Sequence, residues 1–159
     1  FLGHTFSVPA ISGSVSKREV TADISERKMK KIKTRIVKSI QAYNSDHNFK
    51  DLQKRMWIIS ANHFFFDHRS GRYRGAGIYH NYQFIDETSK SLQGLDDFLR
   101  HAITSGKGKI FENFKSATNN TQRSKIMKCS FKRNFEEKKH YSFKNVELER
   151  LMRCWKYAI

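Results

Sequence analysis

Acidic residues are scarce in this chain, in which 15 Asp and Glu stand against 31 Lys and Arg among 159 residues. The formal net charge of +16 at pH 7 exceeds what solubility requires and indicates a large acidic partner. The sequence also lacks any uncharged apolar run of about 18 residues, the minimum for a membrane-spanning helix. Anionic glycans, membrane surfaces bound peripherally and nucleic acids are therefore the candidate partners.

Proline and cysteine are equally rare, with one proline and two cysteines in the chain. Because the proline is Pro9, nothing in the rest of the sequence prevents helix formation. Two cysteines cannot form a disulfide framework, but Cys129 and Cys154 form either a single bridge, if the protein is secreted, or two buried thiols. Their spacing does not match a metal site, and we expect no metal and no cofactor.

Hydrophobic residues make up 38% of the chain and aromatic residues 13%, which is enough to bury a core. Apolar residues recur at helical spacing, and few segments alternate with period two. These patterns predict an all-α fold, a compact bundle of about five to seven helices. The longest predicted helices cover residues 24–43 and 49–68, and both are free of proline.

Basic residues recur at helical spacing beside apolar ones in two segments. The first basic stripe consists of Lys28, Lys31, Arg35 and Lys38. The second basic stripe, which is weaker, consists of Lys125, Lys128 and Lys132. Like charges at this spacing repel one another, so the stripes favour a function in binding an anionic surface.

Residues 69–77 combine three glycines with Arg69, Arg72 and Arg74. The segment lacks the preceding strand and the Lys-Ser/Thr ending of a phosphate-binding loop. We therefore interpret it as a flexible cationic hinge that could clamp an anionic group.

Aromatic residues gather in the predicted second helix. Trp57, Phe64, Phe65 and Phe66 are candidate lipid-contacting residues, with core packing as the alternative. His63 and Asp67 have the i, i+4 spacing of metal ligands on a helix, but no third ligand accompanies them. No hydrolase motif is present, and we expect no catalytic residues and no enzymatic activity.

Two features favour secretion. Residues 1–16 contain no Lys, Arg, Asp or Glu, so we expect a flexible N-terminal arm or a processing remnant before a basic helical domain at 17–159. Asn119 begins the sequence Asn119-Asn120-Thr121, a candidate glycosylation site.

Three short motifs fall in order between Arg35 and Arg69. Ile36-Val37-Lys38-Ser39-Ile40 is followed by Leu52-Gln53-Lys54-Arg55 and then by His68. In this register the chain resembles the abalone sperm lysin family. That family includes lysin, which opens the egg vitelline envelope without catalysis, and a fusagenic paralogue implicated in sperm–egg membrane fusion, to which this chain is more similar.

The resemblance implies a secreted protein of the acrosomal vesicle that acts in fertilisation as a non-enzymatic helical bundle. Its implied partner is an anionic membrane surface or an egg-coat component, and it implies a homodimer as one arrangement. A basic nucleic-acid-binding helical protein is the alternative interpretation, because the same stripes could neutralise phosphates.

Overall fold

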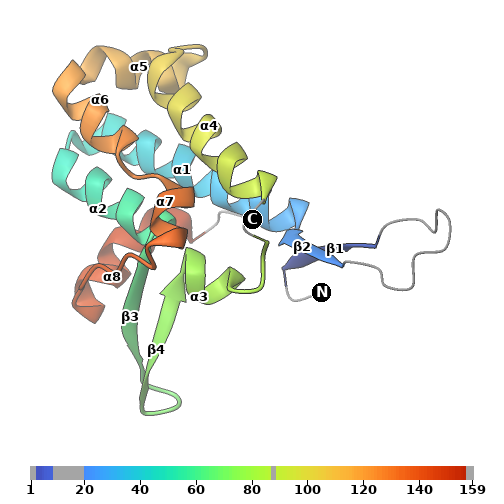
Figure 1. Cartoon of the computed structure of the whole chain (residues 1–159). Helices are drawn as coiled ribbons and strands as arrows, with labels where there is room; N and C mark the ends of the chain where they lie inside the picture. Colours follow the sequence, from blue (N-terminus) through green and yellow to red (C-terminus); the bar gives the residue numbers. More distant parts are fainter. Residues whose placement is uncertain (1–2, 9–19, 87–88, 157–159) are drawn as a thin grey trace, which may run out of the picture.

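The structure is a computed structural model that describes residues 3–8, 20–86 and 89–156 (Figure 1). It is mostly helical, with eight α-helices among the described residues. The strands are β1 (His4–Ser7), β2 (Thr21–Ile24), β3 (Asn62–Asp67) and β4 (Arg72–Gly77). The helices are α1 (Glu26–Asp46), α2 (Phe49–Ser60), α3 (Ile78–Tyr82), α4 (Lys90–Thr104), α5 (Lys109–Ala117), α6 (Asn120–Met127), α7 (Phe131–Glu136), α8 (Asn145–Met152) and the 3-10 helix η1 (Arg153–Trp155).

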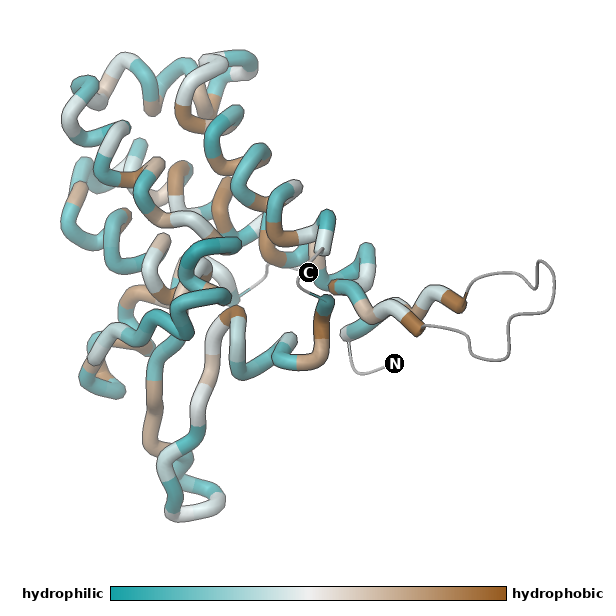
Figure 2. The backbone as a smooth tube through the Cα atoms, viewed as in Figure 1, coloured by the Kyte–Doolittle hydropathy of each residue, from teal (hydrophilic) through white to brown (hydrophobic). Residues whose placement is uncertain are grey.

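The hydrophobic core lies where α1 packs against α2, α4 and α5 (Figure 2). Ile36 and Ile40 of α1 are fully buried, one turn apart on the same face. The predicted helix 24–43 is confirmed with a small shift, since α1 extends to Asp46. His47 ends the helix in the left-handed conformation, and its N–H donates to the Tyr43 carbonyl.

The prediction of an all-α fold is wrong in one respect, because the helices are accompanied by two small antiparallel sheets, β1–β2 and β3–β4. In the first sheet His4 pairs with Ile24. The Ala22 N–H donates to the Asp86 carboxylate at 2.8 Å, which joins β2 to the segment after α3. Strand β1 belongs to the predicted N-terminal arm, and residues 1–2 and 9–16 of that arm lie outside the described residues.

The predicted helix 49–68 is also wrong in its second half. Helix α2 ends at Ser60, Ala61 is extended, and β3 follows. Consecutive phenylalanines favour strand over helix. The chain changes direction at Asn62, whose fully buried side chain holds this point in place through hydrogen bonds. Its side chain donates to the Lys139 carbonyl at 3.1 Å and accepts from the Tyr79 N–H at 2.9 Å.

Residues 69–77 form a turn and a strand, so the interpretation as a hinge is corrected. Strand β4 pairs with β3 in a hairpin that projects from the helices (Figure 1). Asp67 stabilises the turn by accepting from the Arg69 N–H at 3.1 Å and the Ser70 hydroxyl at 2.9 Å. Gly71 supplies the left-handed conformation that the turn requires, with φ +64°.

The segment that carries the second basic stripe is not one continuous helix. It is divided into α6 and α7 by residues 128–130. Asp96 of α4 accounts for the break, because its carboxylate accepts from the Phe131 N–H at 2.6 Å and the Ser130 hydroxyl at 2.8 Å. The Ser130 hydroxyl in turn accepts from the Arg133 N–H and caps α7.

Candidate functional site

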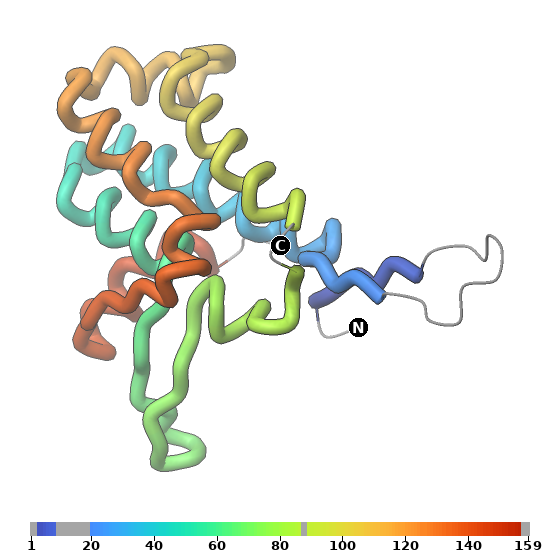
Figure 3. Tube along the Cα trace, viewed as in Figure 1, coloured from blue at the N-terminus to red at the C-terminus, as the bar shows by residue number. Residues whose placement is uncertain are grey.

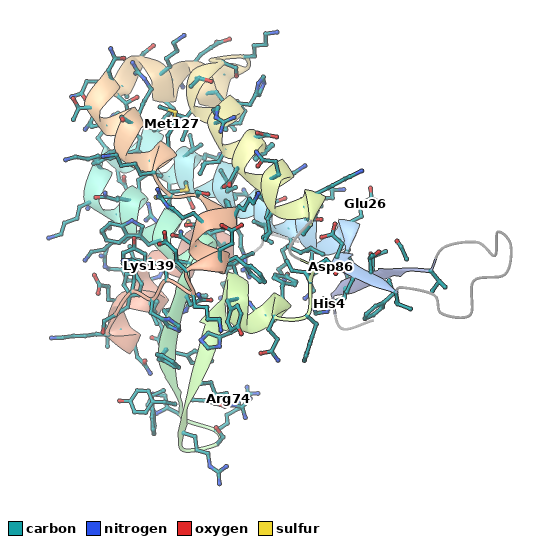
Figure 4. The ribbon with its side chains drawn as sticks, viewed as in Figure 1. His4, Glu26, Arg74, Asp86, Met127 and Lys139 are labelled. Carbon is teal, nitrogen blue, oxygen red and sulfur yellow. The ribbon has the colours of Figure 1, made fainter. Side chains whose placement is uncertain are left out.

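The tip of the β3–β4 hairpin carries exposed cations. Arg69, Arg72 and Arg74 are all exposed there, and Figure 4 labels Arg74 on the hairpin. Arg74 forms an ion pair with Asp67, with its Nε 2.9 Å from Asp67 Oδ2. Among the described residues, neither Arg69 nor Arg72 pairs with an acidic side chain. Hydrogen bonds from Ser70 and the Arg69 N–H lower the pKa of Asp67, so the carboxylate that holds the turn stays ionised.

Exposed aromatic rings accompany these cations. Phe64 is 52% exposed and stacks on His140, with 5.0 Å between ring centroids. Tyr73 is 75% exposed and meets Phe66 edge-on at 5.3 Å. Tyr73 is the centre of the Arg72-Tyr73-Arg74 sequence, and the register pairs it with Phe66 on one face of the hairpin.

The remaining candidate lipid-contacting residues are in less exposed places. Trp57 is half-buried and stacks on Tyr141, with ring centroids 4.6 Å apart and planes nearly parallel. Phe65 and Phe66 are half-buried and line a cavity. Trp57 and Phe65 pack against the core, which is the alternative left open for this group, whereas Phe66 is half-buried and lines the cavity.

The first basic stripe lies on α1, and its four residues are half-buried rather than fully exposed. The stem of Lys28 packs close to the Gly3 backbone. Arg35 lies over the ring of Trp155, at 5.6 Å from the centroid. Burial lowers the pKa of the Arg35 guanidinium, and its buried Nε finds no hydrogen-bond partner among the described residues. The first basic stripe is therefore partly buried, and not all of its charge is available to an external partner.

Arg35 faces a partly open cavity of about 940 Å³ between α1, the hairpin, α3 and the α8–η1 segment. Figure 3 shows the hairpin beside the C-terminal helices, and Asn145 of α8 exchanges two hydrogen bonds with the Phe66 backbone. A smaller cavity of about 220 Å³ shares Arg35 and Tyr82 with it and adds Lys28 and Lys31. The cavity could not be predicted from the sequence, because its walls come from segments far apart in the chain.

The second basic stripe is fully exposed. Lys125 lies on α6, Lys128 directly follows that helix, and Lys132 lies on α7. Helices α6 and α7 pack against α2 and α4, and α1 packs against α2, α4 and α5. The two stripes therefore do not lie on adjoining helices, and they do not form the single continuous face that adjacency would give.

Three histidines meet at the base of the hairpin. His63 is only 6% exposed, and its buried Nδ1 has no hydrogen-bond partner within the described ranges. His80 and His140 lie with their Nε2 atoms 2.9 Å apart. His63 and Asp67 share a strand rather than a helix, and no group of three ligands suited to a metal occurs among the described residues.

We expect the stability of the fold to depend on pH through His63. Burial, followed by the nearby His80 and His140, lowers its pKa from 6.5 to about 4. The unfolded chain therefore binds the proton more readily than the folded chain does. The contribution of neutral His63 to the free energy of unfolding is fully present above about pH 6.5 and is lost as the pH falls toward 4. Urea unfolding at pH 7.5 and 4.5 should show a smaller difference for His63→Phe than for the parent. An equal difference, matching that of the exposed control His101→Gln, would contradict the assignment.

The two cysteines are not joined to each other, and the candidate glycosylation residue Asn119 caps a helix. Cys129 and Cys154 are free thiols in the structure, and burial raises the pKa of Cys129 to about 12. Asn119 is exposed and caps α6, with its side chain accepting from the Gln122 N–H. Its glycosylation stays a prediction.

Within the described part of the chain, no helix has the length and apolar character needed to cross a membrane. No family model, curated protein or solved structure matches the chain. The motifs that resemble the lysin family lie on α1 and α2, which pack against each other, with His68 at the end of the hairpin strand. The resemblance itself stays a hypothesis.

Proposed function

We propose that this protein binds anionic membrane surfaces without catalysis and promotes the fusion of the membranes it brings together. The observation that carries the proposal is the projecting hairpin, which exposes both cations and aromatic rings. Arg69 and Arg72 are exposed there without an acidic partner among the described residues, and the rings of Phe64 and Tyr73 are exposed on the same hairpin. The context of a secreted acrosomal protein acting at the egg surface rests on the resemblance to the lysin family.

The chemistry of the hairpin suits an anionic bilayer. A cationic side chain close to an anionic leaflet contributes about 1 kcal/mol to binding. Aromatic rings beside it can then enter the interface, where their apolar bodies leave water. Because hairpin positions 64 and 73 hold exposed aromatic rings and positions 69 and 72 hold exposed cations, both contributions come from one element.

A second contact surface supports the bridging of two membranes. Lys125, Lys128 and Lys132 are exposed on the α6–α7 region, and Figure 1 places α6 at the opposite end of the molecule from the hairpin tip. One protein could therefore contact two anionic vesicles at once. Such bridging would gather vesicles, whereas insertion of the hairpin rings would be needed to mix their lipids.

The proposal is tested with phosphatidylserine vesicles by following aggregation and lipid mixing together. We expect the parent protein to cause both, and both to weaken as salt rises from 0.01 to 0.1 M, because the screening length falls from about 30 to about 10 Å. Phe64→Ser combined with Tyr73→Ser should reduce lipid mixing much more than aggregation.

The same experiment separates the alternatives. Aggregation without lipid mixing by the parent would contradict the fusion proposal and favour a lysin-like binder of the egg envelope. Tighter binding to duplex DNA than to phosphatidylserine vesicles at equal salt would favour the nucleic-acid interpretation. Vesicles of phosphatidylcholine alone serve as the uncharged control.

A further inference from the structure

The cavity beside α1 has the size and walls of a ligand site. Its volume of about 940 Å³ falls within the range of small-molecule pockets, and its walls are mostly apolar. The apolar lining includes Ile58, Ile59, Phe65, Ile78, Leu148 and Trp155. These side chains come from α2, β3, α3, α8 and η1. The cavity is therefore enclosed by five elements, and their side chains leave its volume empty.

A cation lies in the wall of this apolar space. The Nε of Arg35 is buried without a hydrogen-bond partner, and no acidic side chain pairs with the guanidinium among the described residues. Partial burial of a charge costs free energy, and a bound anion would offset that cost. His63 also lines the cavity, and its buried Nδ1 has no hydrogen-bond partner in the described part of the chain.

The surroundings of Arg35 are positive overall. The adjoining smaller cavity brings Lys28 and Lys31 to the same end, and its described lining contains no acidic residue. Among the described residues that line the larger cavity, Glu149 of α8 is the acidic one. Arg153, four residues later in the sequence, also lines this cavity. The end formed by α1 therefore favours an anionic group.

We infer that the cavity binds a single-chain anionic amphiphile, with its carboxylate or phosphate on Arg35 and its hydrocarbon chain among the apolar side chains. Lys28 and Lys31 attract the head group from the adjoining cavity, and Tyr82 offers a hydroxyl beside Arg35. The inference goes beyond the proposed membrane binding and does not depend on it, because the hairpin cations lie outside the cavity lining.

Binding is measured by isothermal titration calorimetry, with the anionic probes below their micellar concentrations and the uncharged probe below its solubility limit. Palmitate and palmitoyl lysophosphatidate represent the two head-group chemistries, and hexadecanol represents the chain without charge. We expect one site per protein and a preference of about tenfold or more for the anionic probes over hexadecanol, because charge-assisted hydrogen bonds are the stronger class. The tighter of the two anions identifies the head group. Equal affinity for hexadecanol and both anions, or no binding of any probe, would overturn the inference.

Three variants locate the site. Arg35→Gln should weaken binding of the anionic probes about tenfold while leaving hexadecanol unchanged. Ala76→Leu, which adds bulk to the lining, should weaken binding of all three probes. Lys125→Gln removes one positive charge from the exposed side of α6 and should leave the affinity for all three probes unchanged. If it weakens palmitate binding as much as Arg35→Gln does, the probe adsorbs to the surface and the inference fails.

The two tryptophans provide an independent readout. Trp155 lines the cavity, whereas Trp57 stacks on Tyr141 outside the lining. Dibromostearate, which quenches indole on contact, should quench Trp155 fluorescence in the Trp57→Phe variant and leave Trp57 fluorescence in the Trp155→Phe variant nearly unchanged. Equal quenching in both variants would overturn the assignment of the probe to this cavity.

Discussion

Neutralising the two exposed hairpin cations, by Arg69→Gln together with Arg72→Gln, is expected to weaken binding to phosphatidylserine vesicles about 30-fold at low salt. Each cation contributes about 1 kcal/mol near an anionic leaflet, and 1.4 kcal/mol corresponds to about a tenfold change in affinity. Both side chains are exposed, so the fold should be unaffected. Vesicle co-sedimentation with increasing lipid gives the affinity, and circular dichroism checks the fold.

A matched control separates the hairpin from net charge. Lys107 and Lys109 are exposed near the start of α5, and Lys107→Gln with Lys109→Gln removes the same two charges. We expect this control to weaken vesicle binding only slightly. Equal losses in the two double variants would mean that the whole positive field, rather than the hairpin, determines the affinity.

Gly77→Ala is expected to destabilise the protein by about 3 to 5 kcal/mol, a large share of the stability of a domain of this size. Gly77 lies at the base of the hairpin, where β4 meets α3, with φ +122°. A Cβ there would lie 2.1 Å from the Ala61 carbonyl oxygen and 2.6 Å from the Asn62 Cα. Both atoms belong to the backbone and cannot move aside, so urea unfolding should reveal the loss directly.

Gly71→Ala provides the comparison for this prediction. Gly71 also has a positive φ, +64°, but nothing lies within 4 Å of a Cβ added to it. Replacing Gly71 with alanine should lower the free energy of unfolding only by the strain of the left-handed conformation, about 1 to 2 kcal/mol. If the two alanine variants lose the same stability, close packing at the base of the hairpin is not what requires Gly77.

The sequence predicted the helices whose apolar faces pack within the bundle, and α1 is the clearest example. Its apolar residues are spaced regularly, and Ile36 and Ile40 are fully buried as that spacing requires. The prediction overran in the second helix because Leu52, Met56 and Ile59 continue in helical spacing toward His63 and Phe66. Local periodicity could not register that Asn62 bonds to residues much later in the chain, which ends α2 and begins β3.

The candidate site was predicted in part for a similar reason. Helical spacing identified the first basic stripe, but spacing alone cannot distinguish an exposed cation from one that faces a cavity. Arg35 is of the second kind because Trp155, near the end of the chain, packs under its guanidinium. The arginines of the hairpin were identified from composition, whereas their projection beside Tyr73 depends on the register of β3 with β4.

The membrane-binding role of the hairpin is tested most directly by a fluorescent label at its tip. Ser70→Cys in a Cys154→Ala background places one reactive thiol there, because Cys129 is buried and burial raises its pKa to about 12. An environment-sensitive nitrobenzoxadiazole label at Ser70→Cys should brighten and shift to the blue with phosphatidylserine vesicles but not with phosphatidylcholine vesicles. The same label at the exposed Ser116→Cys on α5 should not respond. A response at Ser116→Cys without one at Ser70→Cys, or no response at either position while the protein co-sediments with the vesicles, would contradict the account.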